Sequence, residues 1–330
     1  MSILADQITI AVTVYSRRQY ISQAVRSALN QSVPVRVMVM EDCGPDAMLE
    51  AVVKAEFGSS IEYIRNPRRR GLFGNWNACL DACATEWLSI LHDDDYLAPD
   101  FVASMIEVER QAPGCALYYG RTLVVDEGGQ GLPEYALPPV DWRWRRAELN
   151  ELLWGTPFPF PGHLMNVAET KKVGGFRETS YYCGDWEMWA KLFAAQGAAQ
   201  TSNVVAYNRS HPGGDKGGNV VFRSGLLLPN SLVQHKRVLA LLGRHGGREF
   251  DRKAYLKNYP VPTRFLLRYG VSLSSRLLRY HLGLLRLSKP PNLGYAVFQR
   301  CAGLGGVPFV RLASMIWNRI SHIRFTRQYY

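Results

Sequence analysis

The segment Thr85-Glu-Trp-Leu-Ser-Ile-Leu-His-Asp-Asp-Asp-Tyr-Leu-Ala-Pro-Asp-Phe101 sets a short apolar run directly against three consecutive acids. The run, residues 87–91, has the composition of a buried strand. The acids Asp93, Asp94 and Asp95 repel one another, and each raises its neighbours' pKa unless a cation lies among them. Acids delivered to the carboxyl end of a buried strand can hold a divalent metal at the edge of an α/β sheet. A solvated acidic turn is the alternative, so the flanking sequence must decide.

Strands and helices alternate before this segment. Apolar runs predict strands at residues 8–15, 35–40 and 61–64, and helical spacing predicts helices at residues 17–29, 46–57 and 75–84. Four strands alternating with helices within about 95 residues predict a parallel sheet with right-handed crossovers. Further along, the pattern predicts a helix at 101–111, a strand at 116–125, a long loop or lid over 126–162, a helix at 185–195 and a strand at 204–207.

The composition excludes several classes of protein. A chain of 330 residues that is 47% hydrophobic and 20% charged is ordinary and globular, with room for one large domain or two. The six cysteines form no CxxC pair, so we expect free thiols in a reducing compartment rather than a zinc site. The amino terminus does not predict a signal peptide, and no apolar run reaches the roughly 18 residues of a spanning helix.

Charge divides the chain into two parts. Residues 221–330 contain 19 lysines and arginines but only the acids Glu249 and Asp251, a net charge of +17, whereas residues 1–220 carry −6. We therefore expect a catalytic domain over residues 1–225 and a basic helical region over 226–330.

The basic region predicts two amphipathic helices. Residues 263–288 and 309–325 place arginines and small polar residues on one face and leucines or aromatic residues on the other. Such helices suit an anionic cytoplasmic membrane surface, which predicts peripheral association with the inner face of the cell membrane. Docking on the catalytic body or on a partner subunit is the alternative. Nucleic acid is a weaker candidate, because the aromatic residues lie away from the arginines.

Six motifs follow one another between about residues 7 and 215. They are Ile10-Ala-Val-Thr-Val-Tyr-Ser-Arg17, Val37-Met-Val-Met-Glu-Asp42, Gly71-Leu-Phe-Gly-Asn-Trp-Asn77, the segment from Leu91 to Pro99, the pair Val173-Gly-Gly-Phe176 and Gly184-Asp-Trp-Glu-Met-Trp189, and Arg209-Ser-His211. In this order they resemble the motifs of the inverting family-2 glycosyltransferases of GT-A fold. The resemblance implies an α/β fold, a Rossmann-like nucleotide-binding mixed sheet flanked by helices, followed here by the basic helical extension.

The resemblance also implies an activity. Such an enzyme moves a sugar from a nucleotide-sugar donor to a hydroxyl of a glycan or a polyprenyl-linked (lipid-linked) acceptor in surface polysaccharide synthesis, with Mn²⁺ or Mg²⁺ as cofactor. Asp185 is the predicted general base, and a helix N-cap is its structural alternative. Asp94 is the favoured metal ligand, and Asp93 and Asp95 are its rivals. The predicted metal site comprises Asp94, Asp95 and His211.

The predicted donor site lies on the first half of the chain. The resemblance implies that it comprises Thr13, Tyr15, Arg17, Asp42, Arg70, Gly71, Asn77 and Asp93. Tyr15 and Arg17 can contact the base, Asp42 can accept a hydrogen bond from a base N–H, and residues 68–70 can bind phosphate. The structural alternatives are packing for Tyr15, Trp186 and Trp189, and solvent exposure for Glu41, His211 and the arginine loop.

One departure from the family keeps other functions open. His92 stands where the family usually has Asp, unless Asp93-Asp94-Asp95 is the family motif shifted by one residue. A nucleotidyltransferase shares the sheet architecture, and a non-catalytic membrane or nucleic-acid adaptor with a degenerate transferase domain is the non-enzyme alternative. A dinucleotide-dependent dehydrogenase is disfavoured, because no G-x-G-x-x-G follows the first strand.

Overall fold

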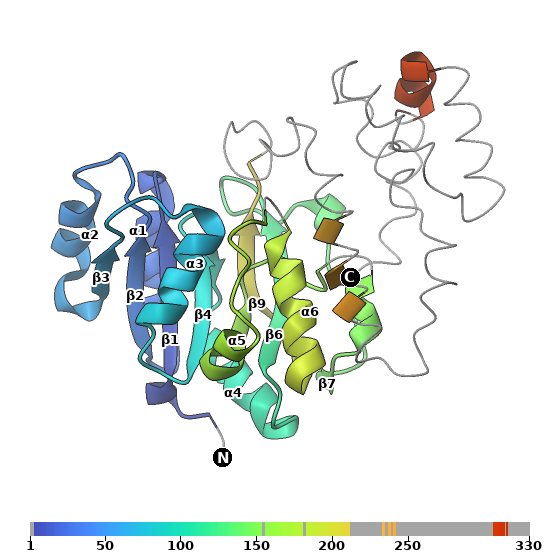
Figure 1. Cartoon of the computed structure of the whole chain (residues 1–330), viewed down its shortest axis with the longest axis horizontal. Helices are drawn as coiled ribbons and strands as arrows, with labels where there is room; N and C mark the ends of the chain where they lie inside the picture. Colours follow the sequence, from blue (N-terminus) through green and yellow to red (C-terminus); the bar gives the residue numbers. More distant parts are fainter. Residues whose placement is uncertain are drawn as a thin grey trace. The chain divides into compact units, whose positions relative to one another are not determined.

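The computed structural model describes residues 3–153, 156–180 and 183–211, together with 233–234, 237–238, 240–241, 306–313 and 315. The chain divides into two compact units, residues 1–210 and 211–329. The first unit contains the sheet and its helices (Figure 1). The predicted boundary at residues 225/226 and the predicted helix at 263–288 lie outside the described residues. Of the second predicted basic helix, residues 309–313 and 315 are described and helical.

A nine-stranded sheet forms the body of the first unit. Its strands are β1 (Ile8–Val14), β2 (Arg36–Glu41), β3 (Glu62–Arg65), β4 (Trp87–His92), β5 (Tyr96–Leu97), β6 (Leu117–Val125), β7 (Trp144–Arg146), β8 (His163–Asn166) and β9 (Ala198–Arg209). They lie in the order β3-β2-β1-β4-β8-β6-β9-β5, and β7 pairs with β9. The sheet is mixed, because β8 runs antiparallel to both β4 and β6.

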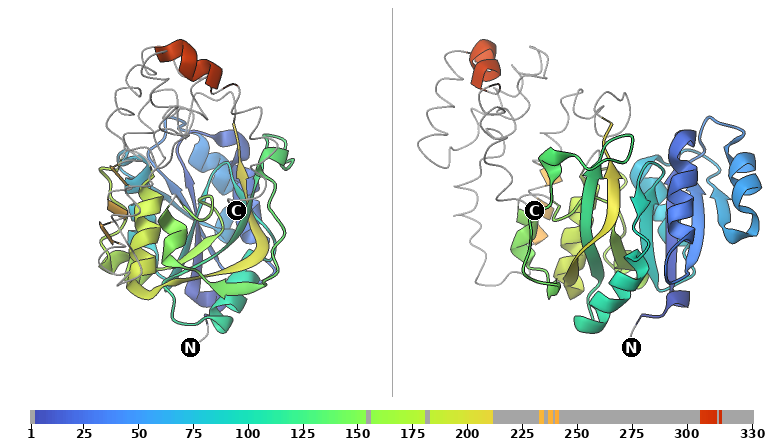
Figure 2. Two further views of the ribbon diagram at one scale, coloured as in Figure 1. Left: turned by 90° about the vertical axis from the view of Figure 1, so that its right-hand side faces the viewer. Right: turned by 180° about the vertical axis from the view of Figure 1, so that it is seen from behind.

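Helices cover both faces of the sheet. They are α1 (Arg18–Leu29), α2 (Leu49–Phe57), α3 (Gly71–Ala82), α4 (Phe101–Gln111), α5 (Val167–Lys172) and α6 (Gly184–Gln196), with short 3-10 turns at Ala5–Gln7, Gly58–Ser60, Pro133–Tyr135 and Leu149–Leu153. Figures 1 and 2 show α3, α5 and α6 on one face, α1 and α4 on the other, and α2 beside the β3 edge. Because both faces are covered, all seven residues of β1 are buried, as its nearly continuous apolar sequence predicts.

The parallel strands end together. Thr13 of β1 lies opposite Met40 of β2 on one side and His92 of β4 on the other. The residues that follow these strands therefore meet at one edge of the sheet, which is where open α/β sheets bind their ligands.

The second half of the sheet differs from the sequence prediction. The long loop expected over residues 126–162 is partly wrong, because β7 lies within it and joins the sheet through β9. The strand predicted at residues 204–207 is longer, extending over the whole of β9. The sequence pattern predicted neither β5 nor β8, whose lengths are two and four residues, too short for a recognisable alternation.

Candidate active site

The three acids form a tight turn at the carboxyl end of β4. The turn is closed by the N–H of Asp95, which donates to the carbonyl of His92 at 3.2 Å. All three acids are buried, with 8%, 8% and 2% of Asp93, Asp94 and Asp95 exposed. The alternative of a solvated acidic turn is therefore wrong. Buried carboxylates require partners, and β9 and the turn before α1 supply them.

Asp95 is held by strand β9. Its Oδ1 accepts the backbone N–H of Arg209 at 2.8 Å, and the side-chain amide of Asn208 donates to Oδ1 at 3.1 Å and to Oδ2 at 3.2 Å. Hydrogen bonds to the charged form of a carboxylate favour that form. Asp95 thus fastens the acid turn to a strand more than 100 residues later, since it is 114 residues from Arg209.

Asp93 and Asp94 both face Arg17, which precedes α1. The guanidinium of Arg17 forms an ion pair with Oδ2 of Asp94. Asp93 is hydrogen-bonded to the backbone of Arg17; burial raises the pKa of Asp93 to about 6, and the positive charge of Arg17 opposes the rise. Arg17 is therefore the positive group that this acidic turn requires.

A second arginine, Arg209, donates a hydrogen bond to the backbone of the turn. Its Nε donates to the carbonyl of Asp94 at 2.9 Å, and one terminal nitrogen donates to Oε1 of Gln23 at 2.6 Å. The guanidinium lies over the rings of Tyr20 and Tyr96, 4.6 and 5.5 Å from their centroids. The sequence identifies Arg209 only as part of a motif, because its buried position depends on contacts between segments that are distant in the chain.

His92, Asp94 and Asp95 form a candidate metal centre. One ligand atom from each lies within 4.8 Å of the others. Nδ1 of His92 is 3.6 Å from Oδ2 of Asp95, and its ring stacks on Phe160 with centroids 4.4 Å apart. One imidazole nitrogen and two carboxylates fit Mn²⁺, and the carboxylates suit Mg²⁺. Asp93 lies outside this cluster. His211 begins the second unit, so its role as a ligand stays a prediction.

Asp185 lies in the first turn of α6, one residue after Gly184. The N-cap of the helix is Cys183, at φ 58°, so the alternative of Asp185 as N-cap is wrong. Desolvation raises the pKa of Asp185, while the N–H of Trp186, 2.9 Å from Oδ1, and the nearby His92 oppose the rise. A carboxylate whose pKa is raised toward neutrality is suited to accept a proton. His92 is thus close enough to influence Asp185 while also facing the acids of β4.

The start of α6 is fixed against α3. A Cβ on Gly184 would come within 2.5 Å of the ring of Phe73. Trp186 and Trp189 are 6% and 0% exposed, and Nε1 of Trp186 donates to the carbonyl of Leu152 at 2.7 Å. Both tryptophans therefore pack in the core, which is the alternative that the sequence analysis gave for them. This packing sets the position of Asp185.

A buried histidine completes the aromatic core next to His92. Nδ1 of His163 lies 2.7 Å from the carbonyl of Phe160, and Nε2 accepts the N–H of Ile90 at 3.4 Å, which assigns the proton to Nδ1. Burial lowers the pKa of His163 to about 4. It is therefore neutral near pH 7 and connects the Phe160 segment to β4.

On the donor side, Thr13, Tyr15 and Arg17 follow one another along the end of β1. Thr13 is buried and its hydroxyl donates to the carbonyl of Leu91 at 3.3 Å. Tyr15 is half-buried, and the guanidinium of Arg69 lies 4.4 Å from its ring centroid. A planar cation on an aromatic ring leaves this corner able to stack on a flat base.

Asp42 holds the loop that precedes α3. Its Oδ1 accepts the N–H of Arg70 at 2.7 Å, and Oδ2 accepts the N–H of Gly71 at 2.9 Å. Gly71 adopts φ 76°, a conformation that favours glycine. Asp42 thus shapes the predicted donor loop, in addition to any contact with a base.

Glu41 is a structural acid of the strand end that precedes Asp42. Its exposed fraction is 0%, so the surface-acid alternative is wrong. It accepts from the hydroxyl of Tyr63 at 2.6 Å and from the N–H of Gly44 at 2.9 Å, and it pairs with Arg65 at 2.6 Å. A Cβ on Gly44 would clash with the carbonyl oxygen of Tyr15, so this turn accepts only glycine.

Arg70 and Asn77 connect this loop to the segment before α6. The side chain of Arg70 lies 3.4 Å from Glu178. Asn77 donates to the carbonyl of Phe176 at 2.8 Å and accepts the N–H of Phe176 at 2.9 Å. In this structure Asn77 is a clamp between α3 and the Gly-Gly-Phe motif, and its predicted contact with the donor remains a prediction.

With this geometry established, the chain was compared with known proteins. Residues 9–166 match the sequence profile described as glycosyl transferase family 2. This part of the chain is a family 2 glycosyl transferase domain. The match includes β1 to β4 and the acid turn, and it ends at the last residue of β8.

Two curated relatives of the family 2 domain have names that refer to polysaccharide synthesis. The chain is 34% identical over 126 residues to the succinoglycan biosynthesis protein ExoO of Rhizobium meliloti (strain 1021), covering 38% of this chain and 36% of the relative. It is 24% identical over 204 residues to chondroitin synthase of Escherichia coli, covering 61% of this chain and 28% of the relative. The chain thus spans roughly a third of the length of these relatives.

Solved structures resemble the fold over nearly the whole chain. S. aureus TarS 1–349 in complex with UDP-GlcNAc is 15% identical, with a TM-score of 0.55, covering 95% of this chain and 92% of that chain. S. aureus TarS 1–349 in complex with UDP matches with the same TM-score, 0.55, at 14% identity. Likeness at this identity confirms the predicted fold class, a GT-A mixed sheet flanked by helices.

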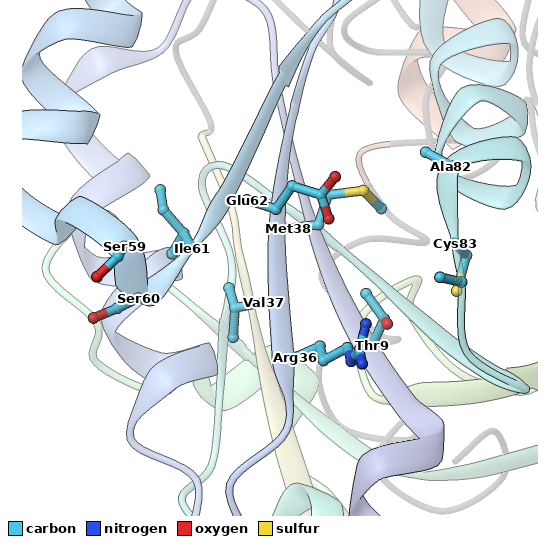
Figure 3. A pocket seen from close by; sticks show the side chains of 11 residues that line it. Thr9, Arg36, Val37, Met38, Ser59, Ser60, Ile61, Glu62, Ala82 and Cys83 are labelled. Carbon is cyan, nitrogen blue, oxygen red and sulfur yellow. The ribbon is translucent and has the colours of Figure 1, made fainter.

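The family 2 domain also has a hollow of about 300 Å³ at the opposite edge of the sheet. Figure 3 shows its lining at the amino ends of the first strands, including Thr9, Arg36 and Glu62. It is remote from the acid turn. Among the described residues, no helix combines the length and apolar character needed to cross a membrane.

Proposed function

We propose that this chain is a metal-dependent, inverting glycosyltransferase that moves a sugar from a nucleotide-sugar donor to a hydroxyl of a glycan or lipid-linked acceptor. One observation carries the proposal. In a family 2 domain, the imidazole of His92 faces the carboxylates at the end of β4 and also lies close enough to Asp185 to influence its pKa. A candidate cation site thus includes a side chain whose charge also acts on a desolvated acid.

The chemistry follows from these two acidic groups. The acceptor hydroxyl attacks C1 of the donor sugar in line with the departing diphosphate, and Asp185 accepts the hydroxyl proton. A single displacement without a covalent intermediate inverts the configuration at C1. His92, Asp94 and Asp95 would hold a divalent ion, which when bound neutralises charge on the leaving diphosphate. Arg17 and the Tyr15–Arg69 corner would orient the nucleotide.

A donor panel tests the activity. The full chain is incubated with UDP-, GDP- and dTDP-sugars in Mn²⁺, Mg²⁺ or chelator, and the released nucleoside diphosphate is measured. UDP-sugars are the first choice, since TarS structures hold UDP and UDP-GlcNAc. We expect release that requires metal and that Asp94→Ala reduces to background. Metal-independent release, or full activity in Asp94→Ala, would contradict the proposed metal site.

The same panel separates the rival functions. A nucleotidyltransferase would release pyrophosphate from a nucleoside triphosphate and leave nucleotide sugars intact. An adaptor with a degenerate domain would bind none of the donors in a metal-dependent way. Either result would remove the proposed activity.

We further propose that the enzyme is peripheral on the cytoplasmic face of the cell membrane, where it serves surface polysaccharide synthesis. The support is the net charge of +17 over residues 221–330 and the polysaccharide functions named for the relatives. The full chain should sediment with vesicles containing anionic lipid but not with neutral vesicles, and added salt should release it. Equal binding to both kinds of vesicle would contradict an electrostatic anchor.

A further inference from the structure

Arg17 forms an ion pair with a carboxylate that the proposed metal centre requires. Its guanidinium pairs with Oδ2 of Asp94, and the two side chains are 22% and 11% exposed. Asp94 is also a member of the His92, Asp94 and Asp95 cluster. A divalent ion that binds this cluster must therefore compete with an arginine already on the chain.

The arginine is placed to stay near the acids whichever partner it takes. It belongs to the turn between β1 and α1, and its backbone is hydrogen-bonded to the carboxylate of Asp93. Only the guanidinium has to move when Asp94 takes another cation. Guanidinium groups bind phosphate oxygens through two parallel hydrogen bonds, so a diphosphate offers Arg17 a partner as good as a carboxylate.

We propose that Arg17 exchanges Asp94 for the diphosphate of the donor, so that the metal ion binds tightly only together with a nucleoside diphosphate. This inference rests on the proposed function. Without the diphosphate, Arg17 neutralises the acid turn and weakens metal binding. With it, the metal takes Asp94 and Arg17 takes a phosphate oxygen. The protein thereby avoids holding a metal ion in an empty donor site.

Arg18 provides a matched control. It neighbours Arg17 in sequence and carries the same charge, but its side chain is 50% exposed and lies 3.7 Å from Asp46 rather than near the acid turn. Replacing either arginine by glutamine changes the net charge equally. Only the Arg17 substitution removes the competitor for Asp94.

The experiment measures Mn²⁺ binding to the full chain from the electron paramagnetic resonance signal of the free ion. Wild type, Arg17→Gln and Arg18→Gln are titrated alone and with UDP, inorganic pyrophosphate or uridine. An arginine beside an aspartate shifts that carboxylate's affinity for protons by at least about tenfold. We therefore expect Arg17→Gln alone to bind Mn²⁺ roughly tenfold more tightly than wild type, and Arg18→Gln to match wild type. UDP and pyrophosphate, but not uridine, should tighten Mn²⁺ binding more in wild type than in Arg17→Gln.

Two results would overturn the inference. One is equal Mn²⁺ affinity of wild type and Arg17→Gln without phosphate. The other is equal tightening by UDP in both proteins. A complete absence of Mn²⁺ binding in every sample would instead remove the metal centre, and with it both this inference and the proposed function. Thermal unfolding of each variant verifies its fold. If Arg17→Gln is unstable, Arg17→Lys is used in its place. Because this substitution keeps the charge, we expect it to bind Mn²⁺ like wild type.

Discussion

Asp94 and Asp95 at the end of β4 and Asp185 at the start of α6 are held in opposite ways. Asp94 pairs with Arg17, and Asp95 accepts hydrogen bonds from Asn208 and Arg209. Asp185 is desolvated, and its carboxylate accepts the N–H of Trp186, the next residue of its own helix. Carboxylates held by a cationic side chain and by hydrogen-bond donors are suited to binding a cation, whereas a desolvated carboxylate is suited to taking a proton. In the proposed function, the first region binds the cation and the second accepts the proton.

The largest expected effect concerns Asp185 at the start of α6. Asp185→Asn removes the proposed proton acceptor while keeping the shape of the side chain, so the turnover rate should fall by about 10²–10⁴-fold. Sugar transfer measured at saturating donor gives this value. The exposed Asp81 of α3 is the matched control, and Asp81→Asn should retain wild-type activity. An Asp185→Asn enzyme with normal turnover would show that the base lies elsewhere.

The next effect concerns Arg209, which supports the β4 side. Arg209→Met keeps the length of the side chain but leaves the carbonyl of Asp94 and the amide of Gln23 without their donor. We expect the free energy of unfolding to fall by about 3 kcal/mol. Denaturant titration measures it. Arg26→Met, at an arginine that is 64% exposed and paired with Glu56, should cost less than about 1 kcal/mol. Equal losses in the two variants would show that the buried contacts of Arg209 add no stability.

The desolvation of Asp185 predicts how stability depends on pH. Because the folded state raises this pKa, the stabilisation linked to Asp185 is fully present below its unfolded pKa and is lost as pH rises through the folded value. Asp185→Asn avoids that loss. In metal-free buffer, the Tm of the variant should match wild type near pH 4 and exceed it at pH 8. A difference that does not change with pH would mean that Asp185 is not desolvated.

The smallest expected effect concerns the hydrogen bonds that hold Asp95 at the end of β4. Asn208→Ala removes the side-chain donor to Asp95, but the N–H of Arg209 remains. Stability should fall by about 1 kcal/mol, and Mn²⁺ affinity in the presence of UDP should weaken about fivefold. Asn203 lies on the same strand as Asn208 and donates to Ser104 of α4, so Asn203→Ala should leave Mn²⁺ affinity unchanged. A loss of affinity in both variants would indicate a general loosening of β9.

The sequence predicted the parallel half of this molecule well. Strands β1 to β4 are short and linked by helices, and β1, β2 and β4 are almost entirely buried, so apolar runs and helical spacing located them. The position of the acids at the edge of the sheet followed from the end of one strand. Glu41 shows the limit of this reasoning: its burial depends on Tyr63 and Arg65, which follow a whole helix later.

The antiparallel half was harder to predict for a related reason. Strands β5, β7 and β8 are two, three and four residues long, so their existence depends on partners that local pattern does not reveal. The same holds for the partners of the candidate site. Asn77 joins Phe176 across 99 residues, and no spacing rule connects them. The identity of a chemical group could be read from the sequence, but its supporting contacts could not.

The anchoring of the acid turn by β9 has a consequence for biosynthesis. A nascent chain that has emerged only as far as β8 already contains the complete family match and every parallel strand of the first four. Asp95 still lacks the donors of Asn208 and Arg209 at that stage, and Asp94 lacks the guanidinium beneath its carbonyl. Contacts of such long sequence separation form late and slowly. The acid turn therefore gains its full set of hydrogen bonds only after β9 has been translated.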